Sequence, residues 1–432
     1  MTGAPDRGAA ALPSDDPQRR VLHDEVHARP PARLVTPERI THLALRVDAQ
    51  DRDREARRIA ELAAHLGAPV PAPDASYVWL DGGDLRVKWE RHTEFTGLTF
   101  FRRVGGDAPP GATALDLVPR GFLASMPGET LVAVHVDVRR SGPQDCDDAI
   151  TTYGDTAVVG SRVGDGAASA LTDFRIGDDG FSRIQVLDHA LGERQAGRYV
   201  QRLCEIETYR MMALLAFPLA REVAAALTAA EARLARLIER MIGPGEADEP
   251  RLLDELTRLA AEIERSEAAS RFRFGAAAAY YRIVRQRIAE LREARLPRVQ
   301  TIEEFMDRRL APAMATCESV ARRQDELSAR IARASQLLRT RVEVALERQN
   351  QELLASMNRR AKMQFRLQRT VEGLSVAAIT YYGAGLVGYL AKAAGALGLH
   401  VQPELAAGVA VPVIALVVWR ALRRLHRELA RE

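Results

Sequence analysis

Two short stretches of the sequence combine histidine with carboxylates at spacings that could support metal binding or proton transfer. His23 and His27 lie four residues apart with Glu25 between them, and His42 follows further along the chain. Zinc needs three or four converging ligands, and this order is not the pattern in which two histidines of one helix flank a catalytic glutamate. Hydrogen-bonded structural roles for Glu25, His27 and Arg29 are therefore favoured over a metal site.

The second stretch, from Trp89 to Glu94, places His92 two residues before Glu94 and could hold a carboxylate–histidine pair for acid–base catalysis. Charged residues that alternate along a strand, however, usually belong to its solvent-exposed face. The sequence has no nucleophile elbow, no P-loop and no dinucleotide-binding glycine pattern. Gly164-Asp165-Gly166 indicates only a turn. We therefore expect a protein that is not an enzyme and holds no cofactor.

The composition favours a folded soluble body over a polytopic transporter. The 432 residues are enough for two or three domains, and 28% are charged. A net charge of only +3 argues against nucleic acid as a partner. The separated Cys146, Cys204 and Cys317 predict buried, inert thiols in a reducing compartment. Residues 1–20 have no apolar core, so they predict a disordered tail and no signal peptide.

Two apolar runs near the C-terminus are long enough to interact with a membrane. Residues 373–391 contain no charge, and a helix of that length spans roughly the ~30 Å hydrocarbon core at ~1.5 Å per residue. Residues 405–419 are also uncharged; this shorter run fits if Glu404 and Arg420 snorkel. The alternatives are a buried core helix and a re-entrant or interfacial segment. We predict a two-helix transmembrane hairpin with residues 392–404 as its external loop.

Basic residues on both sides of this hairpin predict its orientation. Arginines and a lysine between residues 359 and 369 precede the first run, and arginines crowd the tail 420–432. The loop carries one lysine, one histidine and one glutamate. Since basic residues stay on the cytoplasmic side, both termini are expected in the cytoplasm. The Ala/Arg-rich composition is typical of a GC-rich bacterial genome, so the membrane is expected to be a bacterial inner membrane.

The body of the chain predicts an α+β fold. Residues 21–190 are expected to form a cytoplasmic domain with a mixed sheet, an amphipathic helix at 51–66 and loops over 164–180. The predicted strands are 40–47, 77–80, 85–89, 98–102, 131–138, 156–163 and 181–187. Residues 197–296 then predict an antiparallel pair of long helices, 197–242 with a bend at Pro218 and 252–296.

A long stalk helix is predicted over residues 300–372. After Pro312 and up to Glu372 there is no proline or glycine, and apolar residues recur every three or four positions. Sixty helical residues would be roughly 90 Å long, and such a helix needs partner helices, which we expect to be copies of itself. No break separates the stalk from the run 373–391, so we predict one continuous helix.

Several stretches resemble one bacterial family of unknown function, number 3422, which is described only as membrane-anchored. They read EVHARP, WERHTEF, GDGAASALTDFR and GRYVQRLCEIETYR, with a fifth stretch at 371–388, and are distributed over nearly the full length. The resemblance implies a membrane location and no known activity. Its signature residues of unknown role are Glu25, His27, Arg29, His92, Glu94 and Asp173.

The order of the predicted elements also resembles the CorA magnesium-channel family, in which five copies of such a chain surround a pore. Residues 385–390 lie where that family has a glycine-rich turn ending in Gly-Met-Asn, and Pro403-Glu404-Leu405 resembles its Pro-Glu-Leu. Tyr389 and Leu390 replace the Met-Asn pair, which removes the amide that would face a hydrated cation. The pore candidates that this resemblance implies are Gly385, Gly388, Tyr389, Leu390 and Glu404, with Glu404 as the candidate metal ligand.

Two functions follow from this reading. The first is a CorA-like homo-oligomeric channel or transporter for a divalent cation, with Mg²⁺ as the expected ion. The second is a membrane-anchored sensor or scaffold that transports nothing. Ser375 and Thr380 lie ~140° apart around a helix, so the first membrane helix offers a poor polar stripe for a pore.

Overall fold

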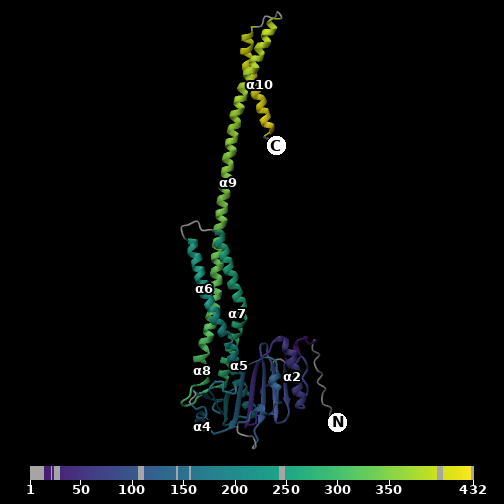
Figure 1. The fold of residues 1–432 in the computed structure, drawn as a ribbon, viewed down its shortest axis with the longest axis vertical. Helices are drawn as coiled ribbons and strands as arrows, with labels where there is room; N and C mark the ends of the chain where they lie inside the picture. Colours follow the sequence, from purple (N-terminus) through teal and green to yellow (C-terminus); the bar gives the residue numbers. More distant parts are fainter. Residues whose placement is uncertain are drawn as a thin grey trace, which may run out of the picture. The chain divides into compact units, whose positions relative to one another are not determined.

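The computed structural model describes residues 14–20, 22–23, 30–105, 111–142, 145–154, 157–242, 249–396 and 402–429. They form an α+β protein in which a mixed sheet is followed by long helices (Figure 1). The chain divides into two compact units: Met1–Ala247 with Asp254–Ala334, and Asp248–Leu253 with Ser335–Glu432. The α+β class predicted from the sequence is confirmed.

The first unit is built on one sheet. Its strand order among the described residues is β2-β3-β4-β1-β5-β8-β7-β6-β9. Strands β5 and β8 run parallel, whereas the other neighbouring strands pair antiparallel. The strands are β1 (Glu38–Arg46), β2 (Tyr77–Asp81), β3 (Leu85–Arg91), β4 (Thr96–Arg103), β5 (Glu129–Arg140), β6 (Val159–Val163), β7 (Ala168–Thr172), β8 (Ser182–Asp188) and β9 (Ala294–Arg295).

The helices are concentrated in the second half of the chain. They are α2 (Arg52–His65), α3 (Phe122–Ser125), α4 (Cys146–Thr151), α5 (Glu193–Leu214), α6 (Ala216–Ile242), α7 (Glu249–Leu291), α8 (Ile302–Arg309), α9 (Ala311–Ala396) and α10 (Pro403–Leu429). Helix α5 ends at Leu214. In a continuous helix the ring of Pro218 would clash with the carbonyl of this residue. The helix predicted over 197–242 is therefore interrupted at Leu215. Helix α9 runs without a break from Ala311 to Ala396, whereas the first residues of the stalk predicted from residue 300 form the separate helix α8.

Two segments differ from the sequence prediction. Residues 164–180 contain strand β7 instead of loops alone, and the helix predicted to end at residue 296 ends at Leu291, with Ala294–Arg295 forming β9. Strand β7 was missed because its residues, Ala-Ser-Ala-Leu-Thr, are mostly small and lack the usual β-branched apolar side chains. All five are buried between β6 and β8, so sheet packing outweighs the weak local preference.

One face of the sheet near β3 is an apolar core. Helix α2 covers it, and its Ile59 and Leu62 pack with Trp89, Leu98 and Phe100 of β3 and β4. The side chains of these five residues are fully or almost fully buried. Trp89 donates from Nε1 to the buried Glu55 of α2 at 2.9 Å, which satisfies the only polar atom of the indole.

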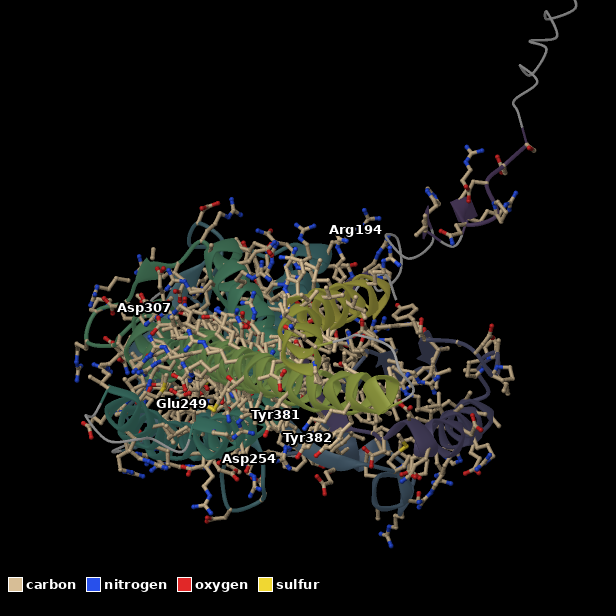
Figure 2. All side chains as sticks on the ribbon, turned by 90° about the horizontal axis from the view of Figure 1, so that it is seen from above. Arg194, Glu249, Asp254, Asp307, Tyr381 and Tyr382 are labelled. Atoms are coloured by element: carbon tan, nitrogen blue, oxygen red, sulfur yellow. The ribbon has the colours of Figure 1, made fainter. Side chains whose placement is uncertain are left out.

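Helices α6, α7 and α8 and the first part of α9 form a bundle beside the sheet (Figure 1). Arg233 and Arg240 of α6 pair with Glu262 and Glu255 of α7, and this inverse order shows that α6 and α7 are antiparallel. At the start of α9, the side-chain amide of Gln324 contacts α7 through Ser266 and Ser270. Helix α8 is tied to α7 by an ion pair between Asp307, labelled in Figure 2, and Arg285.

The second unit consists mainly of the rest of α9 and α10. Adding a Cβ at Gly383 would place it 3.0 Å from Ile414, and one at Gly388 would lie 3.8 Å from Ala407. As the residue number rises on α9 it falls on α10, so the two helices pack antiparallel through small residues. Tyr381 and Tyr382, labelled in Figure 2, lie in edge contact and are both exposed.

In the part of the chain that the structure describes, three helical stretches are long and apolar enough to cross a membrane, by length and composition. They are Glu193–Ile242, Ile302–Ala394 and Pro403–Arg424. The most apolar window of the first is 33% buried inside the protein, against 17% and 0% for the other two. Helices α5 and α6 use their apolar residues for packing within the first unit, whereas α9 and α10 leave most of theirs uncovered.

Candidate functional site

The second face of the same sheet region is polar, although helix α5 covers it. Antiparallel register places Lys88 of β3 beside Thr99 of β4, and Thr99 beside His42 of β1, so the three form one row across the sheet. Each of the three side chains is buried, and Lys88 is only 4% exposed. Glu90 lies two residues after Lys88 on the same face, opposite Gly97.

A cavity of about 310 Å³ lies over this row. Its floor is the row itself with Gly97, which has no side chain, and its roof is α5, including Gln201, Cys204 and Thr208. Arg287 of α7 closes one side. The cavity volume is at the lower end of the range of small-molecule sites.

Gly197 positions α5 over the sheet. A Cβ at this residue would lie 1.7 Å from the carbonyl oxygen of Ala32, so only glycine allows the segment after Pro31 to cross the helix here. The backbone N–H of Leu34 then donates to the carbonyl of Glu193 at 3.1 Å. Ala32 and Gly197 both line the cavity, and this crossing therefore forms part of its wall.

His42 joins three elements at the floor of the cavity. Its Nδ1 lies 2.8 Å from the Thr99 hydroxyl, and its Nε2 lies 3.0 Å from the Thr208 hydroxyl. Thr208 donates its own proton to the carbonyl of Cys204, so it must accept from Nε2–H of His42. Nδ1 then accepts from Thr99. Burial lowers the pKa of His42 to about 3, with the nearby Lys88 and His92 as lesser causes. The imidazole is neutral and fully hydrogen-bonded, which suits a structural role.

Charged side chains form a chain of contacts along one wall. Lys88 Nζ lies 3.0 Å from Glu90 Oε1 and 3.5 Å from Gln201 Oε1. Gln201 donates to Glu205 at 2.7 Å, and Glu205 accepts from Arg287. A second hollow of about 200 Å³ shares Gln201, Glu205 and Arg287 with the cavity, so these three side chains separate the two spaces.

The loop between β3 and β4 adds an aromatic wall. His92 stacks on Phe95 with ring centroids 4.3 Å apart, and Phe95 meets Tyr209 of α5 edge-on at 6.0 Å. Tyr209 in turn stacks on Tyr280 of α7 at 5.6 Å. The loop, α5 and α7 are thus connected by ring contacts beside the cavity.

Glu94 anchors this loop to α7. Its carboxylate accepts from Arg273 at 2.6 Å and from the Tyr280 hydroxyl at 2.9 Å. Burial and the bond to Glu94 raise the pKa of Tyr280, so its hydroxyl stays protonated and donates. Glu94 therefore has a positioning role, while His92 of the same motif lies at the cavity.

Neither the three cysteines nor Ser169 is placed for nucleophilic attack on a substrate. The three cysteines are free and buried, as the sequence predicted, and burial raises the pKa of Cys204. Ser169 Oγ lies 3.0 Å from His189 Nε2, and His189 Nδ1 lies 2.9 Å from the Ser141 carbonyl. Ser169 is fully buried, so its hydroxyl has no room for a substrate carbonyl.

The remaining residues singled out by sequence are dispersed. Glu25, His27 and Arg29 lie outside the described residues. Asp173 follows β7, and its carboxylate accepts from the backbone N–H of Arg175 at 3.1 Å, which is a turn contact. Among the described residues, no three His, Cys, Asp or Glu side chains come together as a metal site.

The pore candidates all lie in the second unit. Gly388 packs near Ala407, whereas Gly385 faces open space. Tyr389 and Leu390 are exposed on α9, and Glu404 is exposed in the first turn of α10.

Sequence reasoning missed Lys88, His42 and Gly97 as cavity residues. The stretch around Lys88 was interpreted as a solvent-exposed strand face, but α5 buries it. One signal could have pointed to Lys88: of 61 basic residues only Lys88, Lys362 and Lys392 are lysines. A lysine inside a strand with apolar neighbours is unusual in so arginine-rich a chain.

The cavity brings together two stretches on which the sequence resemblance rests, WERHTEF and GRYVQRLCEIETYR. A family model described as "Protein of unknown function (DUF3422)" matches residues 14–429. No curated protein and no solved structure matches the chain. The likeness to the CorA family stays a hypothesis. Because the family match covers almost the whole sequence, this protein belongs to the DUF3422 family.

Proposed function

We propose that this chain is a membrane-anchored ligand-binding protein of the sensor or scaffold type. The observation that carries the proposal is the cavity between the sheet and α5, with buried charged groups on a face that packing alone would fill with apolar side chains. Burying Lys88 and Glu90 costs solvation free energy, and a hydrophobic replacement of a buried ion pair is often as stable or more stable. Recognition of a polar ligand is a reason to keep them.

In this proposal the cavity binds its ligand and catalyses no reaction on it. Both nitrogens of His42 are occupied and the thiol of Cys204 stays protonated, so neither offers a general base or a nucleophile. A sensor needs only a difference in affinity between two states of the protein.

The anchor is the pair of helices at the C-terminus. Their apolar windows are barely covered by the protein, and small residues allow α9 and α10 to approach closely. Basic residues between 359 and 369 and after 420 support a bacterial inner-membrane location with both termini in the cytoplasm. The bilayer is then the first partner of this protein.

The test combines location with binding. The full-length chain should fractionate with membranes, resist extraction by carbonate and be released by detergent. In detergent, a library of small polar metabolites should contain compounds that raise its unfolding temperature. Gly97→Val, which fills the cavity floor with a side chain favoured in strands, should remove that rise. The exposed Gly105→Val is the matched control. A library without any stabilising compound would overturn the proposal.

A CorA-like oligomeric channel for a divalent cation is the second candidate. It is favoured by the apolar side chains exposed along the second part of α9, which a bundle of copies would cover. They include Leu346, Leu353, Leu354, Met357, Phe365 and Leu367. Against it, Ser375 and Thr380 donate their hydroxyl protons within their own helix, and Glu404 is the only carboxylate from Gly373 to the end of the second run.

Mass and flux measurements separate the two candidates. A channel requires a higher oligomer in detergent and uptake of Mg²⁺ into liposomes. A monomer, or a dimer without flux, would leave the anchored ligand-binding protein as the remaining candidate. Flux that survives Glu404→Ala would remove only the role of Glu404.

A further inference from the structure

The charges that line the cavity identify the chemistry of its ligand. Two cations, Lys88 and Arg287, face two carboxylates, Glu90 and Glu205; of the two histidines that line the cavity, His42 is neutral and His92 stacks on Phe95. The cations and carboxylates already neutralise one another in pairs. A ligand with a net charge would leave one of these groups without compensation in a poorly solvated space, which is costly. A ligand of net charge zero avoids that cost.

Lys88 and Glu90 place opposite charges side by side at the cavity floor. Their side chains are 4% and 12% exposed, and Nζ lies 3.0 Å from Oε1. The ammonium of Lys88 has three N–H donors. Its hydrogen bond to the side-chain oxygen of Gln201 is long, at 3.5 Å. An acceptor on a ligand would therefore improve the solvation of Lys88. Such an acceptor would weaken the ion pair between Lys88 and Glu90, so the same ligand must also offer a donor to the Glu90 carboxylate.

The rest of the cavity suits an apolar group. Apolar side chains flank the charged pair on both sides: Phe95 lies beyond Glu90 and Phe101 beyond Lys88 in the strand register, and Val200 of α5 also lines the cavity. Gly97 leaves the floor open: even a Cβ there would touch His42 and Glu90 only at ordinary contact distances of 3.6 Å and more. Charges at one place and an apolar wall at another match a molecule whose charged groups are at one end.

We propose that the cavity binds a free α-amino acid with an apolar side chain, its carboxylate on Lys88, its ammonium on Glu90 and its side chain against Phe95. The ammonium and carboxylate of an α-amino acid are attached to one carbon, so they are as close together as the charges of Lys88 and Glu90. This inference rests on the proposed ligand-binding function and specifies its ligand class.

The test is calorimetry on the full-length protein in detergent with L-leucine and L-phenylalanine as probes. Each is compared with relatives that lack one charge: 4-methylpentanoate and 3-phenylpropanoate without the ammonium, and L-leucinamide and phenethylamine without the carboxylate. We expect at least one amino acid to bind and its single-charge relatives to bind at least about tenfold more weakly, because each leaves a buried charge without its partner.

Variants test the assigned residues. Lys88→Met should abolish binding of the amino acid, whereas Lys362→Met, on an exposed position of α9, should leave its Kd unchanged. If Lys88→Met does not fold, Gly97→Val tests the same site by occupying its floor. Equal affinity for an amino acid and its single-charge relatives would overturn the zwitterion assignment and leave ligand binding intact. Stabilisation by other polar metabolites but by no amino acid would do the same. Absence of all binding would overturn both proposals.

Discussion

The two faces of the sheet at β3 and β4 are built from alternate residues of the same strands, yet they differ in chemistry. Trp89, Leu98 and Phe100 point to α2 and form an apolar core, whereas Lys88 and Thr99 point to α5 and line a cavity. Both faces are buried. A strand buried on both sides usually reads as a nearly continuous apolar run, so the polar face is the exception.

The difference separates stability from recognition. Apolar burial is worth roughly 25 cal/mol per Å² and depends little on which apolar residue supplies it. Buried polar groups contribute little net stability but fix position and charge strictly. Substitutions on the α2 face should therefore change the free energy of unfolding. Those on the α5 face should change ligand binding or the pH dependence of stability, unless they break a buried ion pair and leave one charge without its partner.

The largest effect is expected from Trp89→Ala on the apolar face. It removes the largest fully buried side chain and leaves the buried Glu55 carboxylate without its indole donor, so the loss should be about 3–5 kcal/mol. Denaturant unfolding followed by circular dichroism would measure it. Trp419→Ala, at an exposed position of α10, is the control and should change little. A loss below about 1 kcal/mol would contradict the assignment of this face as the core.

A slightly smaller loss is expected from Arg86→Met at the edge of the polar face. Arg86 pairs with Glu38, whose side chain is fully buried, and also donates to the Arg33 carbonyl at 3.0 Å. Removing the guanidinium should cost about 3 kcal/mol, because Glu38 would be left as a buried charge or would have to bind a proton.

The exposed pair Arg183–Asp179 gives the matched comparison. Arg183→Met should change the free energy of unfolding by less than about 1 kcal/mol, since exposed ion pairs contribute little. Similar losses for Arg86→Met and Arg183→Met would show that burial of the Glu38 pair does not matter.

The sequence predicted the strands well wherever apolar and polar residues alternate. Residues 131–138 alternate cleanly and form β5, whose buried and half-buried residues also alternate. The small residues of β7 carry no such signal, and only the neighbouring strands make it a strand. Likewise, β9 depends on pairing with β6 and has no local preference of its own.

The cavity could not be predicted because alternation does not reveal what covers each face. The pattern around Lys88 is the same whether its polar face meets solvent or α5, and the helix that decides this, with Gly197, lies far along the chain. The C-terminal helices, by contrast, were recognisable because an uncharged run is a local property. Their packing through Gly383 and Gly388 required the structure.

A pH dependence of stability is expected on the polar face. The pKa of His42 falls from 6.5 to about 3 on burial, so between these values the unfolded chain binds one more proton than the folded protein. The free energy of unfolding is not reduced by His42 above pH 6.5. As the pH falls from 6.5 toward 3, it decreases by up to about 1.4 kcal/mol per pH unit. Thermal unfolding at several pH values would measure this slope.

His42→Gln keeps a donor and an acceptor for the two threonines and removes the titration. Its stability should therefore fall less steeply with decreasing pH than that of the unmodified protein. His65→Gln, on the exposed side of α2, should leave the slope as it is. Identical slopes for the His42 variant and the unmodified protein would mean that His42 does not titrate between these limits.

The smallest change is expected from Gly97→Ala at the cavity floor. The new Cβ would lie 3.6 Å from His42 Cε1, an ordinary contact, and alanine lowers the entropy of the unfolded chain, so stability should stay equal or rise by up to about 1 kcal/mol. Gly160→Ala in β6 offers the contrast, because its Cβ would lie 2.4 Å from Leu171 and 2.7 Å from the Ala170 carbonyl. It should destabilise by about 1–3 kcal/mol. If both variants were equally destabilised in thermal unfolding, the floor at Gly97 would be packed and the two faces of the sheet would not differ as described.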